Sequence, residues 1–161
     1  MGVCGCGKSS VGAAIAERLG LPFIEGDVLH PKSNVEKMSR GEPLSDDDRW
    51  PWLEIIGRRM AEALDRGEGI VVSCSALKKV YRDRLRDAVA GRLSFVYLEG
   101  TRALLSERMG SRTGHFMPTS LLDSQLATLE VPTGEPGVVT VGIDREIDEI
   151  ADIAVAGLSI R

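Results

Sequence analysis

The chain has 161 residues, 43% of them hydrophobic and 27% charged, which suits one domain with its own core and excludes a mostly disordered protein. Its 20 Lys and Arg residues against 24 Asp and Glu residues give a net charge of −4, which argues against a general nucleic-acid or anionic-membrane binder. It has no apolar run of the roughly 18–20 residues that cross a bilayer and no charged-then-apolar leader, so we expect a cytoplasmic protein. Its three cysteines are too few and too sparse to predict a disulfide framework.

Helical and strand-like patterns alternate along the chain. The predicted strands, rich in β-branched residues, cover residues 21–25, 69–74, 93–98 and 137–143. The predicted helices cover residues 9–19, 45–66, 79–90, 101–109, 119–130 and 145–158. Because strands that alternate with helices pair in parallel through right-handed crossovers, we expect a three-layer α/β/α sandwich in which residues 1–161 form a single domain.

The longest predicted helix carries clear start and stop signals. Ser45 precedes three aspartates that suit a helix cap, and Pro51 lies near the first turn, where proline is tolerated. Gly67 ends the helix. An apolar stripe along it consists of Leu53, Ile56, Met60, Ala63 and Leu64. We therefore expect one face of this helix to be buried.

The first residues match a phosphate-binding loop, G-x-x-x-x-G-K-[ST], at every fixed position. Glycines let the backbone N–H groups point at the phosphates, and the following helix adds the positive end of its dipole. Lys8 is the expected catalytic lysine that reaches the β- and γ-phosphates, and the Ser9 hydroxyl is the expected Mg²⁺ ligand. The predicted ATP-binding residues of this motif are Gly2, Val3, Cys4, Gly5, Cys6, Gly7, Lys8, Ser9 and Ser10. Because a helical pattern follows directly, an accidental match in a glycine-rich terminus is disfavoured.

One expected neighbour of this motif is missing. A phosphate loop follows a buried strand, yet only Met1 precedes Gly2. We therefore predict that the first strand is largely absent from this chain, and we favour a start that lies further upstream. Cys4 and Cys6 occupy loop positions that need compact side chains, and we favour that role over redox sensing, because sensing needs exposure.

Several longer blocks are more specific than the phosphate loop. They read GVCGCGKS, EGDVLHPKSNVEKMSRGEPLSDDDRWPWL, SCSALKKVYRDRLR, RMGSRTGHFMP and SLLDSQLATLE, in order and without large gaps. These blocks closely resemble the gluconokinase family, which are small P-loop carbohydrate kinases. The resemblance implies a P-loop kinase fold, ATP-dependent phosphorylation of D-gluconate to 6-phospho-D-gluconate, and a homodimer.

Acidic and polar residues follow the predicted strand at residues 21–25. Asp27 lies at the carboxyl edge, where open parallel sheets bind ligands, and a carboxylate there can accept or orient the proton of an attacking hydroxyl. We expect Asp27 to be catalytic and to contact the substrate, with an N-cap or a solvated acid as the alternative. Glu25 is a weaker candidate for holding a Mg²⁺-bound water. His30, in a predicted loop, is a candidate for a sugar hydroxyl or, equally, a structural residue.

Basic residues supply the remaining substrate candidates. Arg49 suits bidentate carboxylate binding, and related small kinases place an arginine near this position. Lys78 and Arg82 follow the strand at residues 69–74 and are expected to attract gluconate or phosphate, although a solvated helix face has the same pattern. Trp50 and Trp52 are expected to pack in the core rather than to shape the sugar pocket. The absence of a terminal aspartate on that strand leaves Mg²⁺ to Ser9, phosphates and waters.

A glycine- and arginine-bearing segment at about residues 108–118 resembles a closing lid. Arg108 is predicted to bind ATP, and Arg112 to stabilise charge on the transferring phosphoryl group. An exposed basic loop is the alternative. The resemblance makes Gln125 a further substrate candidate.

Two rival functions stay open at this point. One is a P-loop kinase for another small acceptor, such as shikimate or a nucleoside. The other is a non-catalytic nucleotide-binding protein, which gains weight if the chain truly starts at Met1. The composition disfavours nucleic-acid and membrane partners for all three hypotheses.

Overall fold

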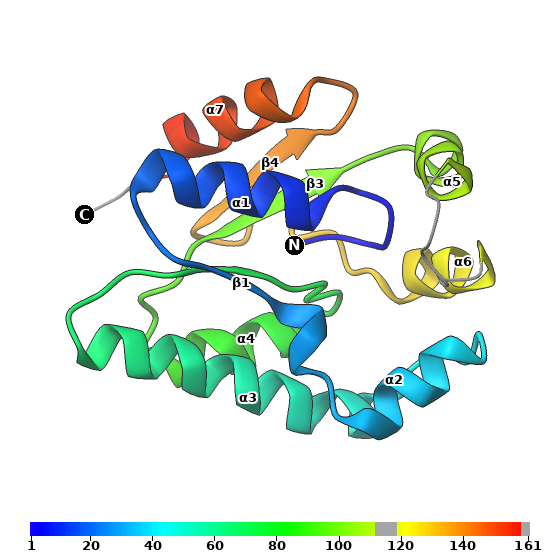
Figure 1. Ribbon diagram of the computed structural model, residues 1–161, viewed down its shortest axis with the longest axis horizontal. Coiled ribbons are helices and arrows are strands. Elements are labelled where there is room, and N and C mark those ends of the chain that lie inside the picture. Colours follow the sequence, from blue (N-terminus) through cyan, green and yellow to red (C-terminus); the bar gives the residue numbers. More distant parts are fainter. Residues whose placement is uncertain (112–118, 159–161) are drawn as a thin grey trace.

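The computed structural model describes residues 1–111 and 119–158. Four short parallel strands form the middle of the molecule, and helices cover both faces (Figure 1). The strands are β1 (Phe23–Glu25), β2 (Val71–Ser73), β3 (Phe95–Glu99) and β4 (Val138–Gly142). The helices are α1 (Lys8–Leu19), η1 (Gly26–Leu29), α2 (Lys32–Ser39), α3 (Asp46–Asp65), α4 (Lys79–Ala88), α5 (Arg102–Gly110), α6 (Thr119–Thr128) and α7 (Ile147–Gly157).

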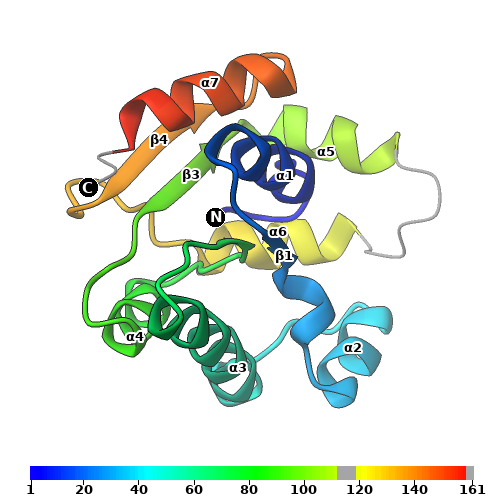
Figure 2. The ribbon, with the colours of Figure 1, turned by 60° about the vertical axis from the view of Figure 1, so that its left-hand side comes forward.

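The strands form two parallel pairs. β1 pairs with β2, and β3 pairs with β4. Helices α1 and α7 pack together on one side of the strands, and α3 and α4 pack together on the other (Figures 1 and 2). The predicted three-layer α/β/α arrangement with parallel strands is therefore confirmed.

Met1 and Gly2 form the backbone link between the two strand pairs. The Met1 amino group donates to the Val96 carbonyl, and the Leu98 N–H donates to the Met1 carbonyl at 3.0 Å. On the other side, the Gly2 N–H donates to the Ser75 carbonyl at 3.2 Å. Below this link, a cavity of about 940 Å³ is lined mainly by apolar side chains of the strands and of α1 and α3. Within residues 1–111 and 119–158, no strand joins the β1–β2 pair to the β3–β4 pair.

Helix α3 begins and packs as its sequence predicts. The Ser45 hydroxyl accepts from the Asp48 N–H, and the Asp48 carboxylate accepts from the Ser45 N–H, which completes a capping box. Its buried face carries Trp52, Leu53, Ile56, Met60 and Ala63. Arg49 lies one turn before Leu53 on the same face of α3, so its side chain is buried.

The segment between β1 and α3 is more helical than predicted. It folds into η1 and the eight-residue helix α2, where we expected a loop. Helix α2 has few apolar residues, so no 3.6-residue stripe marks it in the sequence. Its buried residue is the polar Asn34, which tertiary contacts hold in place. Within the described part of the chain, no helix is both long and apolar enough to span a bilayer.

Candidate active site

The phosphate loop curls at the start of α1. Gly5 and Gly7 have φ angles of 81° and 90°, a region that favours glycine. A Cβ on Gly5 would lie 2.9 Å from Met109 Cγ, so the loop also needs glycine there for space. The Lys8 ammonium donates to the Val3 carbonyl at 2.9 Å and thus lies over the loop. The unpaired N–H groups of the first turn of α1 complete a site suited to phosphates.

Both loop cysteines are buried. Cys6 is 0% exposed and Cys4 is 9% exposed, which fits the predicted compact role. The Cys4 N–H donates to Gln125 Oε1 at 2.7 Å, so Gln125 of α6 braces the loop. Gln125 also lines the pocket described below. The predicted substrate candidate therefore lies at the site and contacts the phosphate loop as well.

Two acidic side chains lie beside the loop, at the carboxyl end of β1. The Glu25 carboxylate accepts from the hydroxyls of Ser9 and Ser73. Asp27 follows on η1, is exposed, and lines the pocket. Hydroxyl and carboxylate oxygens are the donors that Mg²⁺ prefers, so Ser9 with Glu25 behind it fits this ion. Among the described residues, no group of three His, Cys, Asp or Glu residues is placed to hold a metal ion.

Arg49 and His30 form the other end of the site. Arg49 is 5% exposed, and within the described residues its Nε has no hydrogen-bond partner. Its guanidinium carbon lies 5.4 Å from the centre of the Tyr81 ring. The His30 ring stacks on Trp52 with 4.0 Å between ring centroids. Burial, and to a smaller extent the charge of Arg49, lowers the pKa of His30 to about 4.

These two ends face one pocket of about 110 Å³. Its lining comes from the phosphate loop and α1, from η1 and α3, and from α6. Arg49, His30 and Asp27 therefore share a cavity with Lys8 and Ser9. The polar and charged side chains that line the pocket are Lys8, Ser9, Asp27, His30, Arg49, Ser75, Ser124 and Gln125.

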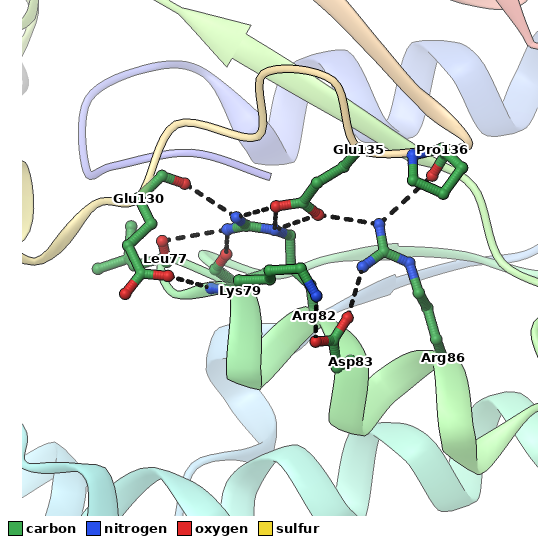
Figure 3. A network of polar contacts seen from close by, with 9 residues as sticks. Leu77, Lys79, Arg82, Asp83, Arg86, Glu130, Glu135 and Pro136 are labelled. Atoms are coloured by element: carbon green, nitrogen blue, oxygen red, sulfur yellow. Dashed lines mark hydrogen bonds and ion pairs between the residues drawn. The ribbon is translucent and has the colours of Figure 1, made fainter.

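Arg82 has a different environment from the one predicted (Figure 3). It is 0% exposed and is absent from the pocket lining. Its Nη1 donates to the carbonyls of Ala76 and Leu77 at 2.8 and 3.1 Å, and its Nη2 to the Glu130 carbonyl at 2.9 Å. Its Nε lies 3.0 Å from the Glu135 carboxylate. The structure therefore does not bring Arg82 to the substrate pocket, because its donors already hold the surrounding backbone.

Lys78 also lies outside the pocket lining. Its ammonium donates to the Asp46 carboxylate at 3.0 Å, which joins the start of α4 to the start of α3. Tyr81 bonds the same carboxylate, and these two hydrogen bonds, Tyr81 first, lower the pKa of Asp46. The structure thus gives Lys78 a bridging contact between two helices instead of the predicted substrate contact.

Arg108 lies beside the phosphate loop, where a nucleotide ligand is expected. Its Nη1 lies 4.0 Å from the position of a Cβ on Gly7, and its Nη2 donates to the Ile143 carbonyl. Arg112 and most of the predicted lid at residues 108–118 fall outside the described residues. The roles of Arg108 and Arg112 stay predictions.

Some pocket residues were not predicted. In the segment that follows β2, Lys78 was the predicted substrate contact, but Ser75 is the residue that lines the pocket. Met38, Pro43 and Leu44 supply an apolar wall, and no local pattern in the sequence marks them. Asn34, which does not line the pocket but contacts His30, was also missed, because the helix that carries it was not predicted. Trp52 is buried, as predicted, and also forms part of the pocket.

Comparisons with known proteins identify the family of the chain. The sequence model of the shikimate kinase family matches residues 4–129. A gluconokinase of Gluconobacter oxydans is 47% identical over 152 residues, covering 94% of this chain and 85% of the relative. The thermoresistant gluconokinase of Escherichia coli is 44% identical over 152 residues, covering 93% and 86%.

Solved structures show the same fold. A gluconokinase from Sinorhizobium meliloti superposes with a TM-score of 0.91 at 58% identity, covering 99% of this chain and 89% of that one. The Mycobacterium tuberculosis APS kinase superposes with a TM-score of 0.67 at 21% identity, over 97% and 92% of the two chains, and indicates the fold alone. The predicted resemblance is confirmed: this chain belongs to the gluconokinase family of P-loop kinases.

Proposed function

We propose that this protein transfers the γ-phosphoryl group of ATP to D-gluconate and forms 6-phospho-D-gluconate. The observation that carries the proposal is Arg49, a buried arginine whose Nε has no partner among residues 1–111 and 119–158, in the same pocket as the phosphate loop. Membership of the gluconokinase family supports the same reaction. The proposal includes a cytoplasmic homodimer, as the family resemblance implies.

Arg49 is suited to the carboxylate of gluconate. A buried cation without full hydrogen bonding is unfavourable, and a ligand carboxylate removes that penalty. A guanidinium binds a carboxylate through two parallel N–H groups, which also orients the ligand. With the carboxylate at Arg49, the rest of the polyhydroxy chain extends toward Asp27 and the phosphate loop.

Asp27 is proposed to orient the attacking hydroxyl and to accept its proton. It lines the pocket between Arg49 and the loop, and phosphoryl transfer depends mainly on positioning and charge stabilisation. Lys8, Arg108 and Arg112 are proposed to stabilise negative charge on the moving phosphoryl group. Ser9 is the proposed Mg²⁺ ligand, with Glu25 holding its hydroxyl in place. ATP would supply the phosphoryl group, and a Mg²⁺ ion held at Ser9 would supply positive charge beside the phosphates.

A coupled assay for 6-phosphogluconate tests this function. We expect ATP- and gluconate-dependent turnover in the wild type and a decrease of about 10²–10⁴-fold in kcat for Asp27→Ala, the range for a general acid–base group. Binding of ATP should persist in that variant. Asp47→Ala is the matched control, because Asp47 is exposed at the start of α3 and does not line the pocket. Full turnover in Asp27→Ala would remove Asp27 from this role.

A shikimate-like acceptor is the second candidate, because the family model that matches residues 4–129 is described as shikimate kinase. Shikimate also carries a carboxylate that Arg49 would bind. ATP consumption measured in parallel with gluconate, shikimate and nucleosides separates these acceptors. Turnover with shikimate alone would overturn the gluconate proposal, and ATP binding without any turnover would favour the non-catalytic alternative.

A further inference from the structure

Asn34 is a buried polar residue whose side chain lies beside the pocket. It is 3% exposed and belongs to helix α2. Its Nδ2 lies 2.8 Å from the backbone carbonyl of Asp48 and 3.2 Å from His30 Nδ1. One amide nitrogen therefore joins the start of α3 to the imidazole that lines the pocket.

The chemistry of these three groups determines where the His30 proton lies. A backbone carbonyl only accepts hydrogen bonds, so the Asp48 carbonyl requires Asn34 to present its NH₂ group and not its oxygen. The NH₂ group has two hydrogens, and the second is directed at His30 Nδ1. In a neutral imidazole, a nitrogen that accepts has no proton, and the proton lies on the other nitrogen. The arrangement thus selects the Nε2–H form.

The surroundings of His30 keep the ring neutral. The ring stacks on Trp52 at an interplanar angle of 16°. The positive charge of Arg49, on α3, disfavours a second proton on the ring and so lowers its pKa. Asp27 of η1 is the acid in the same pocket lining. Burial and the Arg49 charge hold the pKa of His30 far below 7, so at neutral pH the ring carries one proton.

We propose that Asn34 fixes His30 as the Nε2–H tautomer, and that this N–H donates a hydrogen bond to a hydroxyl oxygen of the acceptor substrate. Within the described residues, no group forms a hydrogen bond with Nε2 of His30, and the His30 side chain lines the pocket. This inference rests on the proposed function for its ligand. It makes His30 a specificity residue and Asn34 a positioning residue that acts through it.

The specificity follows from the set of donors and acceptors. Arg49 and His30 both donate, whereas the Asp27 carboxylate accepts. An acceptor molecule must then have a carboxylate, a hydroxyl oxygen that accepts from His30, and a hydroxyl that donates to Asp27. A polyhydroxy carboxylate meets all three requirements, and an analogue that lacks the oxygen facing His30 leaves the Nε2–H without this hydrogen bond.

Nitrogen-15 NMR of the imidazole rings reads the tautomer directly and needs no turnover. The chain has two histidines, and His30→Gln assigns the signals of His30. We expect a protonated Nε2 and an unprotonated Nδ1 in the wild type near pH 7. Asn34→Asp should move the proton to Nδ1, because a carboxylate at this position accepts and cannot donate. Nδ1–H in the wild type would overturn the inference.

Kinetic measurements test whether the Nε2–H of His30 donates a hydrogen bond to the acceptor substrate. Glutamine can place an amide donor near the position of Nε2, whereas asparagine reaches only as far as Nδ1. We expect His30→Asn to raise the acceptor KM about three- to tenfold, the range for one neutral hydrogen bond. His30→Gln should raise it less, and the ATP KM should stay the same in both. Equal acceptor KM values in the two variants would overturn the donor role.

Asn34→Leu should reproduce the KM increase of His30→Asn, with Ser33→Ala, exposed on the same helix, as the control. A parallel increase in the KM for ATP would overturn the positioning role, since it would indicate general damage to the site. A wild type that does not phosphorylate gluconate would overturn the proposed function alone, because the NMR measurement reports the tautomer without turnover.

Discussion

Arg49 and Arg82 are two buried arginines in very different surroundings. Arg82, on α4, is 0% exposed and directs its guanidinium at three backbone carbonyls and the Glu135 carboxylate. Arg49, on α3, is 5% exposed and has an Nε without a partner among the described residues. Both were predicted to contact the substrate, but only Arg49 lines the pocket.

The hydrogen bonding of a buried cation indicates its role. A guanidinium with all its donors in use stabilises the groups around it, and a ligand could bind it only by breaking those bonds. A guanidinium with an unpaired donor carries an uncompensated desolvation penalty, which a ligand can remove. Arg82 therefore belongs to the architecture, where it holds Ala76 at a φ of 45° in a turn that borders the pocket. Arg49 lines the pocket and has an Nε without a partner among the described residues, and our proposal places the substrate carboxylate there.

The largest effect should come from Arg82→Met. Removing one partner of a buried ion pair leaves Glu135 beside unpaired carbonyls, so we expect the free energy of unfolding to fall by about 3–5 kcal/mol. Urea unfolding measures it. The control is Arg84→Met, whose pair with Glu54 is half exposed, at 50% and 55%, and which should cost less than about 1 kcal/mol. Similar losses of unfolding free energy in Arg82→Met and Arg84→Met would contradict the structural role of Arg82.

The next largest effect should be the loss of acceptor binding in Arg49→Leu. Hydrogen bonds to a charged group contribute about 1.5–3 kcal/mol, so the acceptor KM should rise by roughly 10- to 150-fold. The affinity for ATP should stay within about twofold, because Arg49 lies at the other end of the pocket. Arg58→Leu, on an exposed position of the same helix, is the control. An unchanged acceptor KM would show that Arg49 does not bind the substrate.

The same Arg49→Leu variant should have a small effect on stability. Replacing an incompletely paired buried charge by an apolar side chain is often neutral or stabilising, so we expect a change within about 1 kcal/mol. Thermal or urea unfolding in the absence of ligand measures it. A loss as large as that of Arg82→Met would mean that both arginines are structural.

The smallest effect should be a change in the pH dependence of stability. Hydrogen bonds from Arg82, and then from Arg86, lower the pKa of Glu135 below that of a free glutamate side chain. A lowered folded-state pKa gives stability that is present above the unfolded pKa and is lost as the pH falls through the folded value. Glu135→Gln should therefore flatten the loss of stability below about pH 4.5. Glu54→Gln is the exposed control, and an equal flattening in both would exclude Glu135 as the source.

Local signals explain the elements that the sequence predicted well. The capping box at Ser45 and the apolar stripe of α3 are contained within one helix, so their pattern is visible along the chain. Helix α2 was missed because it is short and polar, and its buried residue bonds to Asp48, fourteen positions away. The role of Trp52 as a stacking partner of His30 likewise depends on a contact between η1 and α3.

The sequence by itself determined the phosphate loop, the alternation of strands and helices, and the family, because each depends on neighbouring residues whose spacing dictates backbone geometry. The fold, and not the local sequence, places Arg49 in the pocket lining and Arg82 outside it. The partner that occupies Arg82 is Glu135, 53 residues further along the chain. Such hydrogen bonds form only after the chain has folded, and no local spacing encodes them.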